Sequence, residues 1–272
     1  MTNHSSSSWL EDISPSIKRY QYNGKQQLNE LLDAECDRYR QDEDASEWLL
    51  FEVDKDTFSQ DFCKVEDTER SWSSFRATEN LLLASIMPYE HSAAMGAFGN
   101  ELIKALIPMG LGFALQTYSG ATIKGDENSK QGDNGWGPNR PPPGHDRKWP
   151  TIVLEVAVSE SVSKLQSDVR FWLREGQGKV KHAFTLAVDR NSPNITIDKW
   201  EPEGDREVCT QHVTVYQGAH KHLYSTGAPL TIEFSKLFLC DPEIPREKDI
   251  RFCENDLKEI ATILWLAQGF DV

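Results

Sequence analysis

The hydrophobic positions of the chain are most continuous between residues 152 and 158, which read IVLEVAV. An apolar run of this kind is typical of a strand buried on both faces of a sheet. A helix is predicted next, because apolar side chains recur at helical spacing until the glycines of residues 176–179 stop it. That stripe consists of Val162, Leu165, Val169, Trp172 and Leu173. Four further segments read as strands separated by turns: 180–189, 194–202, 208–217 and 229–238.

Patterns elsewhere in the chain are weaker. Residues 26–40 and 77–106 predict helices, the second interrupted by Pro88, and residues 248–268 predict an amphipathic C-terminal helix. Residues 47–56 read as a short strand or an irregular stretch, and residues 111–123 read as a strand. Residues 125–149 are too rich in Gly and Pro for regular structure.

The order of these elements predicts an α/β fold with a central mixed β-sheet flanked by helices. We expect the main domain to span residues 71–245, with a C-terminal helix packed on its core over residues 246–272. Residues 1–70 hold 17 acidic and 8 basic residues and are expected to form an acidic, partly irregular N-terminal extension.

Composition narrows the classes of function. The 272 residues include 29 Lys and Arg against 43 Asp and Glu, a net charge of −14. This charge argues against tight non-specific binding of nucleic acid, although a metal held by carboxylates reverses the sign locally at a nuclease site. No apolar run approaches the roughly 18 residues of a membrane span, and no secretory leader is readable. The five cysteines are scattered without a CxxC pair, so we expect an intracellular protein, cytoplasmic or nuclear, with no membrane partner.

Glu155 stands out because it interrupts the apolar run 152–158. A carboxylate is rarely buried without a partner, since removing its charge from water is costly. It is therefore a metal ligand at the mouth of a cleft, the partner of a core Lys or Arg, or a residue at a point where the sheet frays. Asp133 lies 22 residues earlier and alone would be an ordinary loop residue. Together the two supply the pair of carboxylates that Mg²⁺ or Mn²⁺ favours.

The residues around both carboxylates also resemble a known motif. Lys130-Gln131-Gly132-Asp133, followed by the segment 150–156 (PTIVLEV), is similar to the core of the PD-(D/E)XK nuclease superfamily. More narrowly, residues 155–161 (EVAVSES) with the following Leu165, Asp168 and Trp172 resemble fungal proteins related to bacterial restriction endonucleases. The resemblance covers about residues 85–240. It implies a restriction-endonuclease-like core in which Asp133 and Glu155 hold Mg²⁺ or Mn²⁺ beside a scissile phosphate.

The chain departs from the superfamily motif at two positions. Gly132 stands in place of a proline, which we expect to matter little because a loop needs only a permissive backbone. Ala157 stands in place of the lysine that, in the superfamily, orients or deprotonates the attacking water.

Another residue must therefore supply the amine if the site is active. Lys130, Lys164 and Arg170 are the candidates, and we favour Lys130. Lys164 and Asp168 are four residues apart on a predicted helix and are expected to form a surface ion pair instead.

A third acidic ligand is open between Glu79, Glu90 and Glu101, each of which also suits a solvated surface. His91 lies on the apolar side of the same helical segment and is expected to be a packed histidine. Residues 159–161 are expected to cap the helix that follows them.

Two hypotheses of function result. The first is a metal-dependent nuclease with catalytic residues Asp133, Glu155 and Lys130, Mg²⁺ or Mn²⁺ as cofactor and nucleic acid as substrate. The second is a catalytically inactive member of the fold that acts as a binding or regulatory protein, which Ala157 and the net charge favour. A homodimer is compatible with either hypothesis.

Overall fold

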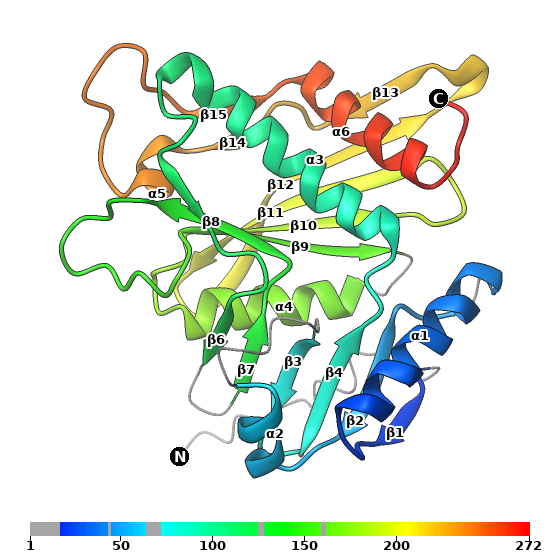
Figure 1. Cartoon of the computed structure of the whole chain (residues 1–272). Helices are drawn as coiled ribbons and strands as arrows, with labels where there is room; N and C mark the ends of the chain where they lie inside the picture. Colours follow the sequence, from blue (N-terminus) through cyan, green and yellow to red (C-terminus); the bar gives the residue numbers. More distant parts are fainter. Residues whose placement is uncertain (1–16, 43–44, 64–71, 125–127, 159–161) are drawn as a thin grey trace.

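The computed structural model describes residues 17–42, 45–63, 72–124, 128–158 and 162–272 (Figure 1). They form a mixed α/β fold with one seven-stranded and one six-stranded sheet, accompanied by a two-stranded ribbon. The large mixed sheet flanked by helices confirms the predicted fold class.

The seven-stranded sheet has the strand order β13-β12-β11-β10-β9-β8-β5. At its centre, β9 (Ile152–Val158) pairs in parallel with β10 (His182–Val188), and every residue of β9 is buried, as predicted. All the other pairings in this sheet are antiparallel. The remaining strands are β5 (Leu115–Thr117), β8 (Asn134–Pro138), β11 (Asn194–Glu203), β12 (Arg206–Gln217) and β13 (Leu223–Thr226).

Helices cover both faces of this sheet (Figure 1). Helices α3 (Tyr89–Leu106) and α6 (Glu254–Ala267) pack together on one face, and α4 (Val162–Glu175) connects β9 to β10 across the other. Because side chains alternate along a strand, Leu154 and Val156 enter the α3–α6 core, whereas Val153 and Glu155 face α4. The alternation therefore places a carboxylate between the sheet and α4.

The six-stranded sheet has the order β1-β2-β4-β3-β7-β6 and is built from two separate parts of the chain. Its strands are β1 (Arg19–Gln21), β2 (Trp48–Glu52), β3 (Trp72–Arg76), β4 (Leu81–Ser85), β6 (Thr122–Lys124) and β7 (Asn128–Gln131). Helix α1 (Lys25–Gln41) and the short α2 (Lys55–Asp61) accompany it, and α2 begins where the Asp54 side chain accepts two backbone N–H bonds. The sheet has an aromatic-rich core of its own, which includes Phe51, Phe58 and Phe75.

The six-stranded sheet crosses the boundary expected at residue 70, because β2 lies before that boundary and pairs with β4, which lies after it. Residues 17–62 contain two strands and two helices, so the described part of the acidic segment is largely regular. Residues 1–16 and 64–71 lie outside the described residues.

Three sequence-based assignments are wrong. Residues 81–85 form the buried strand β4 instead of the start of a helix, since a turn at residues 77–80 returns the chain beside β3. The stretch 125–149 contains β7 and β8, whose pairing with neighbouring strands outweighs the local composition. The predicted strand 229–238 is divided into β14 (Leu230–Ile232) and helix α5 (Phe234–Phe238), and β14 pairs with β15 (Ile250–Phe252).

Short 3₁₀ turns follow α3 at Ile107–Met109 and β12 at Ala219–Lys221. Among the described residues, no helix has the length and apolarity needed to cross a lipid bilayer.

Candidate active site

Glu155 lies on β9 beneath α4 and is 2% exposed. The indole Nε1 of Trp172 donates to its Oε1 over 2.5 Å, and the ammonium of Lys130 lies 3.3 Å from its Oε2. The structure therefore brings Lys130 and Glu155 together, although they come from different sheets.

Lys130 is the central cation of this buried cluster. It belongs to β7, is 1% exposed, and forms a second ion pair with Asp168 Oδ1 at 2.7 Å. Lys164 pairs with Asp168 as predicted, but both side chains are buried instead of lying on the surface. The Lys164 ammonium also lies 4.6 Å from the centre of the Trp48 ring.

Asp133 occupies the short link between β7 and β8, where the chain passes from one sheet to the other. Its Oδ2 accepts a 2.7 Å hydrogen bond from the backbone N–H of Val156, the residue after Glu155. The same oxygen lies 3.2 Å from Nε2 of His91. Asp133 keeps 14% of its side chain exposed, so it is the more accessible of the two carboxylates.

His91 connects Asp133 to a carboxylate of the other sheet. Its Nδ1 lies 3.0 Å from Glu47 Oε2, and the other oxygen of Glu47 accepts the N–H of Val158 at 2.9 Å. Both His91 and Glu47 are fully buried. His91 is packed, as predicted, and it also lies in direct contact with the candidate ligand Asp133.

The sequence did not identify Glu47 as part of this site. It comes directly before the apolar run Trp48–Phe51, so the signal was an acidic residue bordering a buried strand. An acidic residue at a strand end is ordinary, and only the fold shows that this one contacts α3 and the end of β9.

Burial and neighbouring charges shift the pKa values of these groups. Burial raises the pKa of Glu155 to about 8, helped by the charges of Asp168 and Asp133 and opposed by Lys130 and Lys164. Burial opposes ionisation of Asp133 as well. The contacts of Asp133 with His91 and with the Val156 N–H outweigh the effect of burial and lower the pKa of Asp133.

For the two cationic groups, His91 and Lys130, the neighbouring carboxylates outweigh the effect of burial on the pKa. Burial would lower the pKa of His91, but Asp133 and Glu47 raise it well above its ordinary value. Burial also opposes the charge of Lys130, and Asp168 and Glu155 raise its pKa in spite of that. At neutral pH the cluster therefore contains charged Lys130 and His91 beside ionised Asp133, with Glu155 largely protonated.

Gly132 is required by the packing of this site, which corrects the expectation that it matters little. A Cβ added to Gly132 would lie 2.5 Å from Cζ2 of Trp172 and 3.3 Å from Oε1 of Glu155. The indole that donates to Glu155 thus occupies the space that a proline ring at residue 132 would need.

The other candidate ligands lie elsewhere. Glu101 pairs with Lys104, and Glu90 lies 3.4 Å from the hydroxyl of Tyr39. Glu79 is in the turn between β3 and β4. Residues 159–161, expected to cap α4, lie outside the described residues.

Ala157, which replaces the motif lysine, borders a hollow. A cavity of about 370 Å³ is lined by Ala157, Ala187, Asn194 and Thr196, among others. Residues 155 and 157 point to the same face of β9, but Glu155 itself does not line this cavity.

The chemistry of the donor set fits a hard divalent cation. Asp133 and Glu155 supply carboxylate oxygens, the ligand type that Mg²⁺ and Mn²⁺ prefer. Each carboxylate has one oxygen fixed by a direct hydrogen bond, to Val156 N–H or to the Trp172 indole. The other oxygen of Asp133 has no hydrogen bond or ion pair with the described residues.

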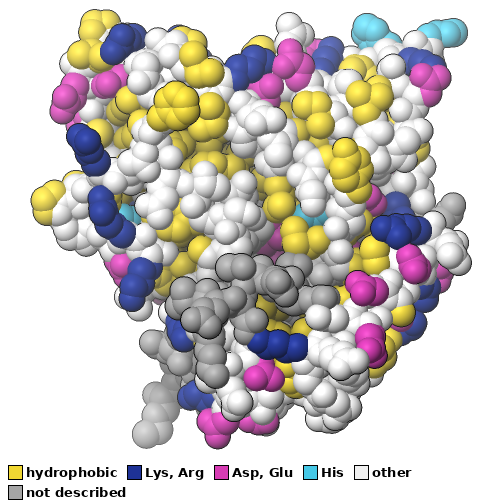
Figure 2. Space-filling view, in the orientation of Figure 1, with side chains coloured by type: hydrophobic (Ala, Val, Ile, Leu, Met, Phe, Trp, Pro, Cys, Tyr) yellow, Lys and Arg dark blue, Asp and Glu magenta, His cyan; other side chains and the backbone are white. Residues whose placement is uncertain are grey.

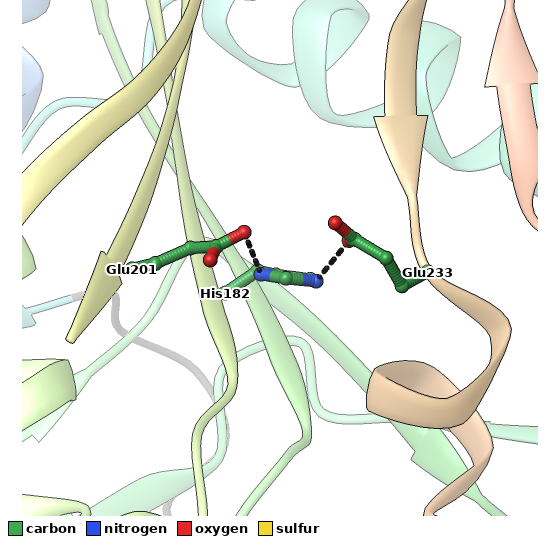
Figure 3. A group of neighbouring side chains, drawn as sticks. All are labelled: His182, Glu201 and Glu233. Atoms are coloured by element: carbon green, nitrogen blue, oxygen red, sulfur yellow. Dashed lines mark ion pairs between the residues drawn. The ribbon is translucent and has the colours of Figure 1, made fainter. Parts of the chain in front are cut away.

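A second group of His and Glu side chains lies away from this site, at the start of β10 (Figure 3). The His182 ring lies between two carboxylates, with Nδ1 3.3 Å from Glu201 and Nε2 2.8 Å from Glu233. One ligand atom from each residue lies within 4.8 Å of the others, as in a metal site. However, the Lys199 ammonium lies 2.8 Å from Glu201 and 2.7 Å from Glu233, so it takes the place of a cation between them.

Comparisons with known proteins give only distant structural likenesses. No protein-family model matches the chain, and no curated protein does. A solved structure from Anabaena variabilis, described as "a putative nuclease belonging to DUF820", is similar with a TM-score of 0.43 and 12% sequence identity. The match covers 75% of this chain and 97% of the other. These values are too low to transfer a function, so the functional conclusion depends on this chain's own residues.

Proposed function

We propose that this protein is a metal-dependent phosphodiesterase that hydrolyses nucleic acid at Asp133, Glu155 and Lys130, on a restriction-endonuclease-like core. The observation that carries the proposal is the ion pair between Lys130 and Glu155 at 3.3 Å. The amine that residue 157 lacks is present beside the glutamate, and it comes from the segment that leads into Asp133.

Asp133 and Glu155 would hold Mg²⁺ or Mn²⁺, which when bound polarises the phosphate and lowers the pKa of water. The protein's own residues fix the carboxylates. Val156 N–H and His91 orient Asp133, and Trp172 orients Glu155. Asp168 holds the Lys130 ammonium within reach of Glu155, where its N–H groups can orient a water molecule.

One test is cleavage of single- and double-stranded DNA and RNA with Mn²⁺ or Mg²⁺. Asp133→Asn and Glu155→Gln preserve shape and remove charge, and each is expected to lower activity at least about 100-fold. Asp205→Asn, in the exposed turn between β11 and β12, is the matched control and is expected to keep full activity.

Calorimetric titration with Mn²⁺ separates the two hypotheses of function. A nuclease is expected to bind the ion with the wild-type sequence and to lose that binding in Asp133→Asn. Absence of both cleavage and metal binding would favour a catalytically inactive binding or regulatory protein. The observation that favours this alternative is the buried pairing of Glu155, Lys130 and Asp168, which already neutralises much of the cluster.

A further inference from the structure

Four surface segments differ in charge from the rest of this acidic chain. Residues 110–114, 139–149, 176–181 and 245–251 together contain eight Lys and Arg and three Asp and Glu, whereas the whole chain has 29 against 43. We name these segments the basic ridge. Figure 2 shows Lys and Arg side chains along the left edge of the view, over the loop before β9 and the loop after α5.

Direct contacts join the first, second and fourth segments. The Arg246 guanidinium lies 3.2 Å from where a Cβ of Gly110 would be. Asn139 donates to the backbone oxygens of Phe113 and Ala114 over 2.7 and 2.8 Å, and Arg147 donates to the Asn139 oxygen over 2.9 Å.

The third segment continues the ridge beside the second. The ammonium of Lys179 lies 5.6 Å from the centre of the Trp149 ring, which ends the loop that carries Arg147 and Lys148. The basic side chains therefore form one continuous surface although they are up to about 100 residues apart in the sequence.

The positive charge of the ridge is available to a ligand. Arg140, Lys148 and Lys248 are exposed and have no acidic partner within 4 Å among the described residues. The three acidic residues instead accept backbone N–H bonds: Asp146 from Lys148, Asp249 from Phe234, and Glu247 from Glu243. Unpaired cations that outnumber the carboxylates of the same segments are typical of a surface that binds phosphate groups.

Phe113 adds an aromatic platform to this surface. Its side chain is 98% exposed, the highest value among the large hydrophobic residues, and its backbone oxygen is fixed by Asn139. A solvated phenyl ring costs free energy unless a partner covers it. Aromatic rings interleaved with Lys and Arg favour unpaired bases, which stack on the ring, over a duplex whose bases are already stacked.

We propose that the basic ridge binds single-stranded nucleic acid, with phosphates on its Lys and Arg side chains and a base stacked on Phe113. Strand β8 (Asn134–Pro138) leads from Asp133 to Asn139, so the ridge at Asn139 lies about 20 Å from the Asp133 carboxylate. That the bound strand leads to Asp133 rests on the proposed function, whereas binding itself does not.

The test is fluorescence anisotropy of a labelled single-stranded DNA of about 20 nucleotides, in EDTA so that no cleavage occurs. Arg140→Glu/Lys148→Glu is expected to weaken binding at least about 10-fold and to reduce the salt dependence of log K by more than about 1. Arg40→Glu/Lys55→Glu changes the net charge equally at exposed sites on α1 and α2, which accompany the six-stranded sheet, and is expected to stay within about 2-fold.

Phe113→Ala tests the aromatic contact and preserves the charge. It is expected to weaken single-strand binding at least about 5-fold and to leave the weaker binding of a duplex of the same length unchanged. Thermal melting of each variant checks that the fold is intact.

Three results would overturn the proposal: no binding by the wild type, equal losses in the ridge and control variants, or a duplex bound more tightly than the single strand. Binding of phosphatidylserine vesicles in place of DNA would overturn it too. Binding without any metal-dependent cleavage would support the ridge and contradict the proposed function, so the two fail separately.

Discussion

His91 Nε2 lies 3.2 Å from Asp133 Oδ2, and this contact links the candidate metal ligand to the six-stranded sheet through Glu47. Glu47 contacts His91 with one oxygen and the backbone of Val158 with the other, so a single carboxylate joins α3, the end of β9 and β2. The site is thereby built from both sheets.

Glu47→Gln removes the charge at this junction and leaves the shape nearly unchanged. We expect the free energy of unfolding to fall by about 3 kcal/mol, because His91 would keep a buried proton with only one anionic partner. Urea denaturation measures the change. Glu52→Gln, at the far end of β2 from Glu47, is exposed and paired with Arg19, and is expected to cost less than about 1 kcal/mol. Equal losses in the two variants would contradict the buried role of Glu47.

Glu155 predicts a pH dependence of stability in the metal-free protein. The pKa of Glu155 in the folded state, about 8, is above its value in the unfolded chain. Its contribution to the free energy of unfolding is therefore fully present below about pH 4.5 and is lost as the pH rises through 8. Denaturation of wild type and Glu155→Gln at pH 6 and pH 9 checks this. From pH 6 to pH 9, the free energy of unfolding of the wild type is expected to fall relative to that of the variant, whose amide does not titrate. A constant difference between the two would show that Glu155 has an ordinary pKa.

Gly132→Ala is expected to cost about 1–3 kcal/mol, because the added Cβ overlaps the Trp172 ring. Gly96→Ala is the matched control, since a Cβ at Gly96 in helix α3 has nothing within 4 Å and is expected to be neutral or slightly stabilising. Combining Gly132→Ala with Trp172→Phe is expected to cost less than the sum of the single changes. Strict additivity would mean that the two residues do not share the space.

Lys199→Ala is expected to convert the group at His182 into a metal site. Removing the ammonium leaves two carboxylates facing each other beside an imidazole, a donor set that suits Zn²⁺. The variant is expected to melt lower than the wild type, and Zn²⁺ is expected to raise its Tm by about 5 °C beyond any shift in the wild type. Lys236→Ala, at an exposed helical lysine, should show no such difference. The idea fails if Zn²⁺ shifts both variants equally.

Ala157→Lys tests whether Lys130 replaces the motif lysine. Lys130→Met is expected to lose nuclease activity, and adding Ala157→Lys is expected to raise the activity at least about 10-fold above that of Lys130→Met, because residue 157 lies on the same face of β9 as Glu155. Ala187→Lys lines the same cavity as residue 157 from β10, on the neighbouring strand, and is expected to give no rescue. Equal rescue by both would show that position 157 has no special relation to the site.

The sequence predicted the elements whose patterns are strong and local. Strand β9 and helix α4 stand out because both are continuous and bounded by breakers. Strands β4, β7 and β8 do not, since each is stabilised by pairing with a partner that sequence patterns cannot specify. The glycines of β8 fit because neighbouring side chains, such as Pro150 beside Gly135, leave no room for a Cβ.

The residues of the candidate site also fall into those that a local sequence pattern indicates and those that only the fold brings together. Glu155 was visible as a charge within an apolar run, and Lys130 as a lysine near Asp133. Glu47 and the burial of Lys164 with Asp168 depend on how the six-stranded sheet packs against β9 and α4, and no local pattern encodes that arrangement.

Gly132 and Asp133 are the two residues between β7 and β8, which makes them the shortest covalent link between the sheets within the described ranges. Asp133 also accepts the backbone N–H of Val156, so this link fastens the end of β7 directly to the strand that carries Glu155. The separation of the two carboxylates is therefore a distance across the junction of two sheets, and it depends on how the sheets are joined as much as on the strands themselves.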